Sequence, residues 1–263
     1  MSLVEWSQRE GVAVLTLNNP PANGYSYDMM RELDEGILRA RFDDSVHVIV
    51  LAGRGEKFFC AGADIAMLDK VTPSFKYAFC LHANETLLRI EHTPKLVIGA
   101  LGGHCVGGGL EVALACDLRV ARRASGKIGL PEVTLGVLPG TGGTQRLARV
   151  LGKAKAIELM CTGELLDYDA AQQLGLVNRV VDVPDETAFL EEVLGWAKSF
   201  CPPGRAAMAV GLIKRAVQTG SEIPLEAGLS LERELQARLF ASVDAREGIS
   251  AYVEKRKPSF TGT

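Results

Sequence analysis

The sequence lacks the residue spacings that mark metal sites, disulfide frameworks and several classes of nucleophilic enzyme. Its six cysteines include no Cys-x-x-Cys pair, and its four histidines show no metal-ligand spacing. There is no Gly-x-Ser-x-Gly elbow, and no histidine stands in a motif that would activate Cys60. We therefore expect reduced, mostly buried thiols in a cytoplasmic protein that needs neither a metal nor a redox cofactor.

An excess of charge of one sign is also missing. The 263 residues include 29 Lys and Arg against 32 Asp and Glu, which leaves a net charge of −3. This balance provides no basic field for nucleic acid. With 47% hydrophobic residues, the composition is typical of a globular chain that forms one large domain, or one domain with an appended subdomain.

Long apolar runs are absent as well. The chain opens without an apolar signal core or an Arg- and Ser-rich transit segment. Within residues 96–116 the uncharged part, 96–110, spans 15 residues and includes six glycines. That is short of the ~20 apolar residues that a membrane span needs. The stretch predicts a buried strand, a glycine turn and a buried helix, and we expect no association with a membrane.

The patterns that are present predict an α/β fold. Apolar strand-like runs at 12–17, 46–51 and 95–101 alternate with helical patterns at 26–41 and 74–91. Uninterrupted apolar strands are typical of a sheet covered on both faces. After the Cys-Pro-Pro-Gly segment the strand pattern disappears, and we expect helices at 206–218, 225–240 and 244–255. The sequence thus predicts an α/β core at 1–201 and a helical region at 202–263.

The first candidate site is a glycine turn that opens a helix. Gly107, Gly108 and Gly109 follow a buried strand, and glycines allow the backbone to approach a ligand closely. The free N–H groups and the dipole of the following helix favour negative charge at this point. Glu111 lies in the first turn of that helix, where it is either a functional carboxylate or only a helix cap.

Two further loops carry candidate groups. Glu132 lies in an apolar loop punctuated by glycine and proline, and such surroundings raise the pKa of a carboxyl group; pairing with a nearby arginine is the alternative. The small residues at 57–65 suit a second backbone N–H donor, while Asp64 in this loop favours a helix cap. The glycine run that ends at Gly143 lacks the Gly-Lys-Ser/Thr ending of a phosphate loop.

In this order and spacing, the motifs resemble the crotonase superfamily, the enoyl-CoA hydratase/isomerase family. The resemblance runs through nearly the whole chain. The matching segments are Phe59-x-Ala-Gly-Ala-Asp64, Gly107-Gly-Gly-x-Glu111 with Asp117, Leu130-Pro-Glu132, Pro139-Gly-x-Gly-Gly-Thr-Gln-Arg-Leu147, Asp244-x-Arg-Glu-Gly248 and Glu254-Lys-Arg256.

The resemblance implies a spiral of β-β-α turns with a C-terminal all-helical region, assembled as trimers that often pair into hexamers. It also implies an acyl-CoA thioester as substrate, with coenzyme A part of that substrate rather than a separate cofactor. The thioester enolate would be stabilised by the backbone amides of Ala63 and Gly108.

Two glutamates favour a 2-enoyl-CoA hydratase within this family. By resemblance, Glu111 helps to activate water for attack at C3, and Glu132 exchanges the proton at C2. Many isomerases of the family keep an acid only at the second position. An isomerase, another enolate-forming lyase or hydrolase, and a non-catalytic acyl-CoA-binding protein remain alternatives.

The resemblance also implies a set of substrate and CoA contacts: Ala61, Asp64, Ile65, Ala66, Gly140 and Lys255, the last near the adenosine 3′-phosphate. Two departures lie near the expected entrance. Asn23-Gly24-Tyr25-Ser26 stands where the family often shows Asn-Ala-Leu-Ser, and Ala66 stands where a lysine or polar residue is frequent. Because Leu225–Phe240 has too many leucines for a solvated helix, we expect a subunit interface there.

Overall fold

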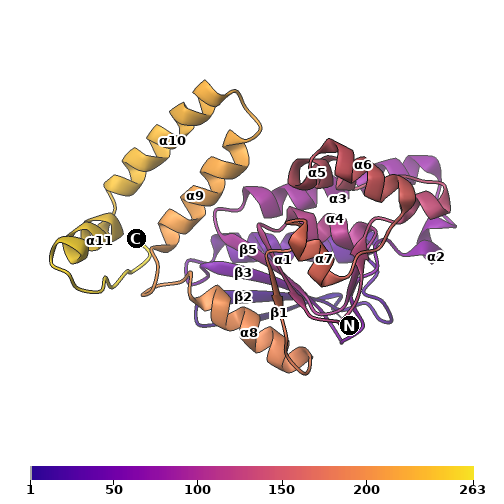
Figure 1. Ribbon diagram of the computed structural model, residues 1–263, viewed down its shortest axis with the longest axis horizontal. Helices are drawn as coiled ribbons and strands as arrows, with labels where there is room; N and C mark the ends of the chain where they lie inside the picture. Colours follow the sequence, from indigo (N-terminus) through magenta and orange to yellow (C-terminus); the bar gives the residue numbers. More distant parts are fainter. Residues whose placement is uncertain (1) are drawn as a thin grey trace.

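The computed structural model describes residues 2–263, except for the side chain of Ala66. Its centre is a six-stranded sheet (Figure 1). The first two strands are antiparallel and every other neighbouring pair is parallel. In spatial order the strands are β1 (Val4–Arg9), β2 (Val12–Leu17), β3 (Val48–Gly53), β5 (Leu96–Leu101), β7 (Leu118–Arg122) and β9 (Arg179–Val181).

A second, smaller sheet is parallel throughout and has three short strands. They are β4 (Phe58–Cys60), β6 (His104–Val106) and β8 (Ile128–Gly129), in that spatial order. Each follows a strand of the large sheet along the chain. The helices between and after the strands are α1 (Tyr27–Phe42), α2 (Ile65–Leu68), α3 (Pro73–His92), α4 (Gly108–Ala115), the 3₁₀ helix η1 (Glu132–Leu135), α5 (Gly143–Leu151), α6 (Lys153–Thr162), α7 (Tyr168–Gln173) and α8 (Glu186–Lys198).

The chain therefore winds as a spiral of β-β-α turns. β3 and β4 lead to α2 and α3, β5 and β6 lead to α4, and β7 and β8 lead to η1 and α5. Every turn places one strand in the large sheet and one in the small sheet. The predicted fold class, an α/β crotonase-like spiral, is confirmed.

Both faces of the large sheet are covered, as the apolar strands predicted. Alternate residues of each strand point to opposite faces. On one face, Val14, Val48 and Ile98 pack against α8 through Phe189 and Val193. The opposite face packs against α1, α3 and α4 in the larger of the two hydrophobic clusters.

Local chemistry sets the helix starts. Ser26 is the N-cap of α1 and accepts a hydrogen bond from the amide of Met29 at 3.3 Å. Thr72 caps α3 in the same way, and Pro73 occupies the first helical position, where no N–H is needed. The two helices predicted at 26–41 and 74–91 are therefore confirmed to within a residue.

Two boundaries differ from the prediction. The strand expected at 46–51 is β3 at Val48–Gly53, because a turn from Asp43 to Val46 delays its start. The stretch at 96–116 holds a buried strand and a buried helix as expected, but the short strand β6 lies between them. Among the described residues, no helix has both the length and the apolar character needed to cross a membrane.

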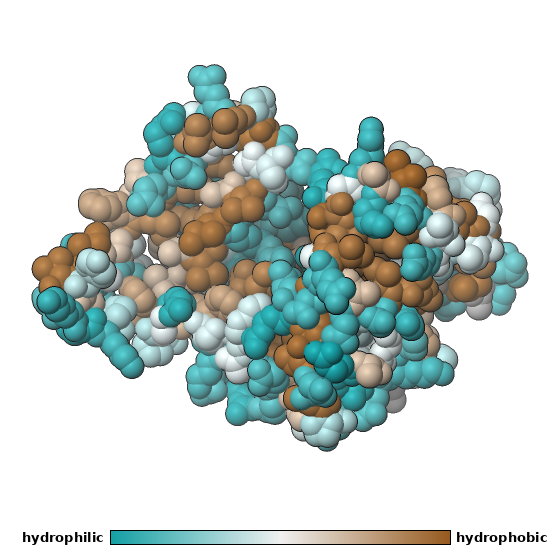
Figure 2. All heavy atoms as spheres, viewed as in Figure 1, coloured by the Kyte–Doolittle hydropathy of each residue, from teal (hydrophilic) through white to brown (hydrophobic). Residues whose placement is uncertain are grey.

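The C-terminal segment forms a helical arm that projects from the spiral (Figure 1). Its helices are α9 (Ala207–Gly220), α10 (Leu225–Phe240) and α11 (Val243–Val253). They correspond to the three helices predicted after residue 202, and the division into two domains stays a prediction. Apolar residues lie open on the arm (Figure 2); Leu225 is 77% exposed and Phe240 is 66% exposed.

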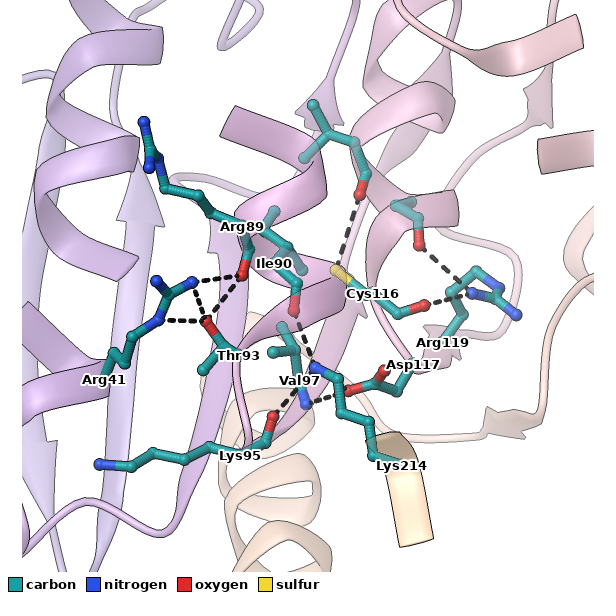
Figure 3. A network of polar contacts seen from close by, with 12 residues as sticks. Arg41, Arg89, Ile90, Thr93, Lys95, Val97, Cys116, Asp117, Arg119 and Lys214 are labelled. Carbon is teal, nitrogen blue, oxygen red and sulfur yellow. Dashed lines mark hydrogen bonds and ion pairs between the residues drawn. The ribbon is translucent and has the colours of Figure 1, made fainter. Parts of the chain in front are cut away.

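A buried ion pair ties this arm to the core (Figure 3). Lys214 of α9 places Nζ 2.8 Å from Asp117 Oδ2, at the end of α4, and the two side chains are 3% and 11% exposed. The ammonium also donates to the carbonyl oxygens of Ile90 and Lys95. Burial raises the pKa of Asp117 to about 6, against the opposing effect of Lys214. The arm thus contacts the core through a buried ion pair, and loss of either partner would leave the other charge buried and unpaired.

We predict that Lys214→Met lowers the free energy of unfolding by about 3–5 kcal/mol, because it leaves the Asp117 carboxylate buried without its partner. Urea unfolding followed by circular dichroism measures the loss. The matched control is Lys155→Met, at an exposed pair with Glu158, which should change stability by less than about 0.5 kcal/mol. Equal losses in the two variants would contradict this account of the arm.

Candidate active site

The small sheet gathers three loops around one cavity. Because β4, β6 and β8 are parallel neighbours, the loops that follow them emerge at the same edge of the sheet. These loops, together with the N-terminal part of α3 and the segment at 137–141, line a cavity of about 580 Å³. The cavity lining is mostly apolar, with the carboxyl groups of Glu111 and Glu132 among its few charged groups.

Ala63 and Gly108, the residues predicted to supply two backbone amides, both line this cavity. Gly62 has φ of +91°, and a Cβ there would lie 2.8 Å from the backbone nitrogen of Gly108. Tyr25 forms a parallel bridge that straddles Ala63: its N–H donates to Gly62 O, and its carbonyl accepts from Asp64 N. The N–H of Ala63 therefore points away from this bridge. Within residues 2–263, neither the Ala63 nor the Gly108 N–H donates to another group.

Glu111 is a buried carboxylate that binds a neighbouring loop. The residue is 2% exposed, and its Oε1 accepts from Thr141 N at 2.8 Å and from Gly143 N at 2.7 Å. Its Oε2 accepts from the Thr141 hydroxyl. Glu111 therefore does not cap its own helix; it holds the 141–143 segment, where α5 begins. Three donors therefore satisfy both oxygens of this buried carboxyl group.

Glu132 lies in a different environment on the opposite loop. Burial raises the pKa of Glu132 to about 7, and the negative charge of Glu111 adds to the effect while Lys76 opposes it. Its Oε2 is buried without a hydrogen-bond partner among the described residues. No arginine pairs with it in that part of the chain, so the raised pKa follows the predicted desolvation. The cavity thus holds one carboxylate with three donors and one carboxyl group that keeps its proton near neutral pH.

The structure brings three of the six predicted substrate and CoA contacts to the same cavity. Ala61, Ile65 and Gly140 line it together with Ala63 and Gly108. Asp64 does not line it; its carboxylate accepts from Met67 N at 3.2 Å and caps α2, as its sequence context favours. Ala66 belongs to α2, but its side chain lies outside the described part of the structure.

Lys255 is another predicted contact that does not line the cavity. It is exposed and lies beyond the end of α11, at the yellow end of the chain in Figure 1, whereas α2 borders the cavity at the opposite side of the molecule. Its role toward CoA stays a prediction.

Sequence reasoning assigned no role in the site to Tyr25, Lys76 or Thr141, although all of them line the cavity. Tyr25 had a signal, because it departs from the family pattern at a position near the expected entrance. Thr141 occupies the open position of the Pro139-Gly-x-Gly-Gly motif, and Lys76 lies in α3 without any motif. Among residues 2–263, no group of three or more His, Cys, Asp or Glu side chains is arranged to hold a metal ion.

The raised pKa of Glu132 generates a prediction about stability. Between pH 4.5 and about 7 the native protein holds a proton on Glu132 that the unfolded chain releases, so the contribution of this residue is present at low pH and is lost as pH rises through 7. Glu132→Gln keeps a neutral group at all pH values. We expect it to raise the free energy of unfolding at pH 8 by about 1–2 kcal/mol, after allowance for solvent screening, and to change it little at pH 4.5.

Urea unfolding at the two pH values measures this difference. Glu85→Gln, on the exposed face of α3, is the matched control and should show no comparable gain at pH 8. A Glu132→Gln variant that gains the same stability at both pH values, or none at pH 8, would show that the carboxyl is not held protonated by burial.

Comparison with known proteins agrees with this geometry. The family model described as Enoyl-CoA hydratase/isomerase matches residues 7–263. A probable enoyl-CoA hydratase of Rhizobium meliloti is 43% identical over 98% of this chain and 96% of its own length, and a crotonyl-CoA hydratase of Syntrophomonas wolfei is 37% identical over 96% and 95%. The crystal structure of an enoyl-CoA hydratase from Geobacillus kaustophilus superimposes with a TM-score of 0.95 at 43% identity, over 100% of this chain and 98% of that one. The chain belongs to the enoyl-CoA hydratase/isomerase family.

Proposed function

We propose that this protein is a 2-enoyl-CoA hydratase, which adds water across the C2–C3 double bond to give a 3-hydroxyacyl-CoA. The observation that carries the proposal is the pair of glutamates in one cavity, beside two backbone amides that have no acceptor among the described residues. The relatives named as hydratases support the same reaction. The acyl chain would lie against apolar residues of the lining, such as Leu68, Val71 and Val137.

The two amides would bind the thioester oxygen. As water attacks C3, electrons move from the double bond onto that oxygen, and the N–H groups of Ala63 and Gly108 donate to the resulting enolate. Preorganised donors of this kind contribute about 2.7–4 kcal/mol each to lowering a barrier. The helix dipole of α4, which begins at Gly108, adds in the same direction.

The two glutamates would divide the proton transfers. Glu111, whose carboxyl group is oriented by three donors, accepts a proton from water as the C3–O bond forms. Glu132, with a pKa of about 7, donates its proton to C2 as the enolate collapses. After this step Glu111 carries the proton that water lost, and Glu132 has lost the proton that C2 received. Release of a proton from Glu111 to solvent and uptake of one by Glu132 return both carboxyl groups to their starting states.

We predict that the wild-type protein removes the conjugated enoyl absorbance of crotonyl-CoA, and that Glu111→Gln abolishes nearly all of this activity. The amide keeps the size of the side chain but cannot accept the proton of water. Glu85→Gln serves as the control for general damage. An unaffected Glu111→Gln variant, or a wild-type protein inactive on short and medium enoyl-CoAs, would overturn the hydratase assignment.

The alternatives give different results in the same assay. A double-bond isomerase that uses one base would lose much less activity in Glu111→Gln and would convert 3-enoyl-CoA. A lyase or hydrolase of the family would release a product from another acyl-CoA. A non-catalytic binding protein would be stabilised by CoA thioesters without forming any product.

We further propose that the active assembly is a homotrimer, alone or paired into a hexamer, and that Lys255 of a neighbouring subunit binds the CoA 3′-phosphate. Lys255 does not line the cavity, and α11, which it follows, lies at the opposite side of the molecule from α2, on an arm with open apolar residues. Such a surface is typical of a subunit interface. We propose the cytoplasm as the compartment, which agrees with six unpaired cysteines.

Lys255→Ala should raise KM for the CoA thioester about three- to tenfold while kcat changes little, because the phosphate contact is the same in the ground state and the transition state. Added salt should reduce the difference by screening the phosphate charge. Lys153→Ala, an exposed lysine on α6, is the control. A wild-type KM for Lys255→Ala at low salt would remove this residue from the CoA site.

A further inference from the structure

Tyr25 joins the parts of the cavity that the proposed reaction uses. Its backbone bonds to residues 62 and 64, on either side of Ala63, at 2.9 and 3.1 Å. Its hydroxyl lies 2.1 Å from where a Cβ on Gly108 would stand, so only glycine at 108 leaves room for it. The residue is 3% exposed, and its ring packs against Phe79 with the centroids 5.8 Å apart. A side chain this confined has one orientation, and its hydroxyl points at the active-site groups.

The hydroxyl of Tyr25 lies 3.1 Å from the hydroxyl of Thr141, which bonds in turn to Glu111 Oε2. The number of protons available fixes the direction of these two hydrogen bonds. The Thr141 hydroxyl has a single proton, and it donates that proton to Glu111 Oε2. Thr141 then has only a lone pair to offer to Tyr25, and the tyrosine must be the donor. The order of donation is Tyr25 to Thr141 to Glu111.

We propose that Tyr25 is a positioning residue of the hydration reaction: through Thr141 it fixes the orientation of the Glu111 carboxylate and stabilises it as the proton acceptor. The proposal rests on the proposed hydratase function. Neighbouring hydroxyls in a chain polarise each other, so the Tyr25 hydroxyl makes Thr141 a stronger donor. Both residues occupy positions where the family motifs do not dictate the side chain: Tyr25 replaces the frequent leucine, and Thr141 fills the open position.

The first test is Tyr25→Phe, which removes the hydroxyl and keeps the ring. We expect kcat for crotonyl-CoA to fall about three- to tenfold, with KM within about twofold. The acid limb of the kcat/KM profile should move to higher pH, since a carboxylate with weaker donors takes up a proton more easily. Because the ring stays in place, the preference for acyl chain length should not change.

Thr141 provides the conservative rescue and the coupling test. Thr141→Val removes the direct donor and should reduce kcat more than Tyr25→Phe does, whereas Thr141→Ser keeps the hydroxyl and should retain most activity. If Tyr25 acts through Thr141, Tyr25→Phe will cause no further loss in the Thr141→Val background. Multiplicative losses in the double variant would overturn the proposal.

Tyr168→Phe is the matched control. Tyr168 is also buried, and its hydroxyl donates to the carbonyl of Gly103, but it does not line the cavity. This variant should lower the urea midpoint and leave the pH profile of kcat/KM unmoved. A Tyr25→Phe variant that behaves in the same way, with stability reduced and the acid limb unchanged, would show that Tyr25 is only structural.

A stability cycle tests the hydrogen bonds without catalysis. Tyr25→Phe should lower the urea midpoint of the wild-type protein, but in the Thr141→Val background it should leave the midpoint unchanged or raise it, because it removes a hydroxyl that has lost its partner. If the wild-type protein hydrates no enoyl-CoA, the proposed function fails while this cycle still decides whether the pair is coupled. If Tyr25→Phe lowers the urea midpoint equally in the two backgrounds, the hydrogen-bonded connection of Tyr25 through Thr141 to Glu111 is refuted.

Discussion

The contact between the 61–63 loop and the first turn of α4 is the constraint on which the site depends. A Cβ on Gly109 would lie 2.0 Å from Cys60 O, and one on Gly62 would lie 2.8 Å from Gly108 N. Any side chain at these glycines would separate the two segments. With the segments in contact, Ala63 and Gly108 line one cavity, and the proposed binding of one oxygen by their two N–H groups depends on this proximity. The small parallel sheet makes this contact possible, because it brings the two loops to the same edge.

The same contact sets the difference between the two glutamates. Glu111 projects from the turn after Gly108 into a position where the 141–143 segment offers three donors, and its charge is therefore tolerated in the interior. Glu132 arrives on the third loop, where its Oε2 has no donor among the described residues. One cavity thus keeps a charged and a protonatable carboxyl group, a division of the kind that acid–base catalysis uses. Burial of the Glu132 carboxyl group without a donor for Oε2 in the described part of the chain lowers the stability of the fold. Such a loss is typical of a residue that is kept for function rather than for packing.

Much of this could be predicted because it is local in the sequence. Ser26 and Thr72 cap helices by contacts with residues three positions further along the chain. The glycines at 107–109 indicate a close approach of the backbone. The spiral and the roles of Glu111 and Glu132 came from the family resemblance. The environment of Glu132 followed from the apolar loop around it, and the structure agrees with the predicted rise of its pKa.

The rest depends on contacts between distant segments. β6 and β8 have three and two residues, which is too few for a periodic hydrophobic pattern. The small sheet therefore could not be predicted from the sequence. Tyr25 and Thr141 are 116 residues apart and meet only because Tyr25 pairs with the loop around Ala63. Lys255 follows the last helix of the arm, and the arm is attached to the core through the buried pair of Lys214 and Asp117, which are 97 residues apart.

The central claim, that two amides bind a thioester oxygen beside Glu132, is tested most directly by hydrogen exchange at C2 of a saturated acyl-CoA. Butanoyl-CoA cannot be hydrated, but it can form an enolate, and mass spectrometry after incubation in D₂O counts the deuterium that it gains. The account predicts exchange with the wild-type protein and with Glu111→Gln, and none with Glu132→Gln. Exchange at the wild-type rate with Glu132→Gln, or its loss only in Glu111→Gln, would contradict it.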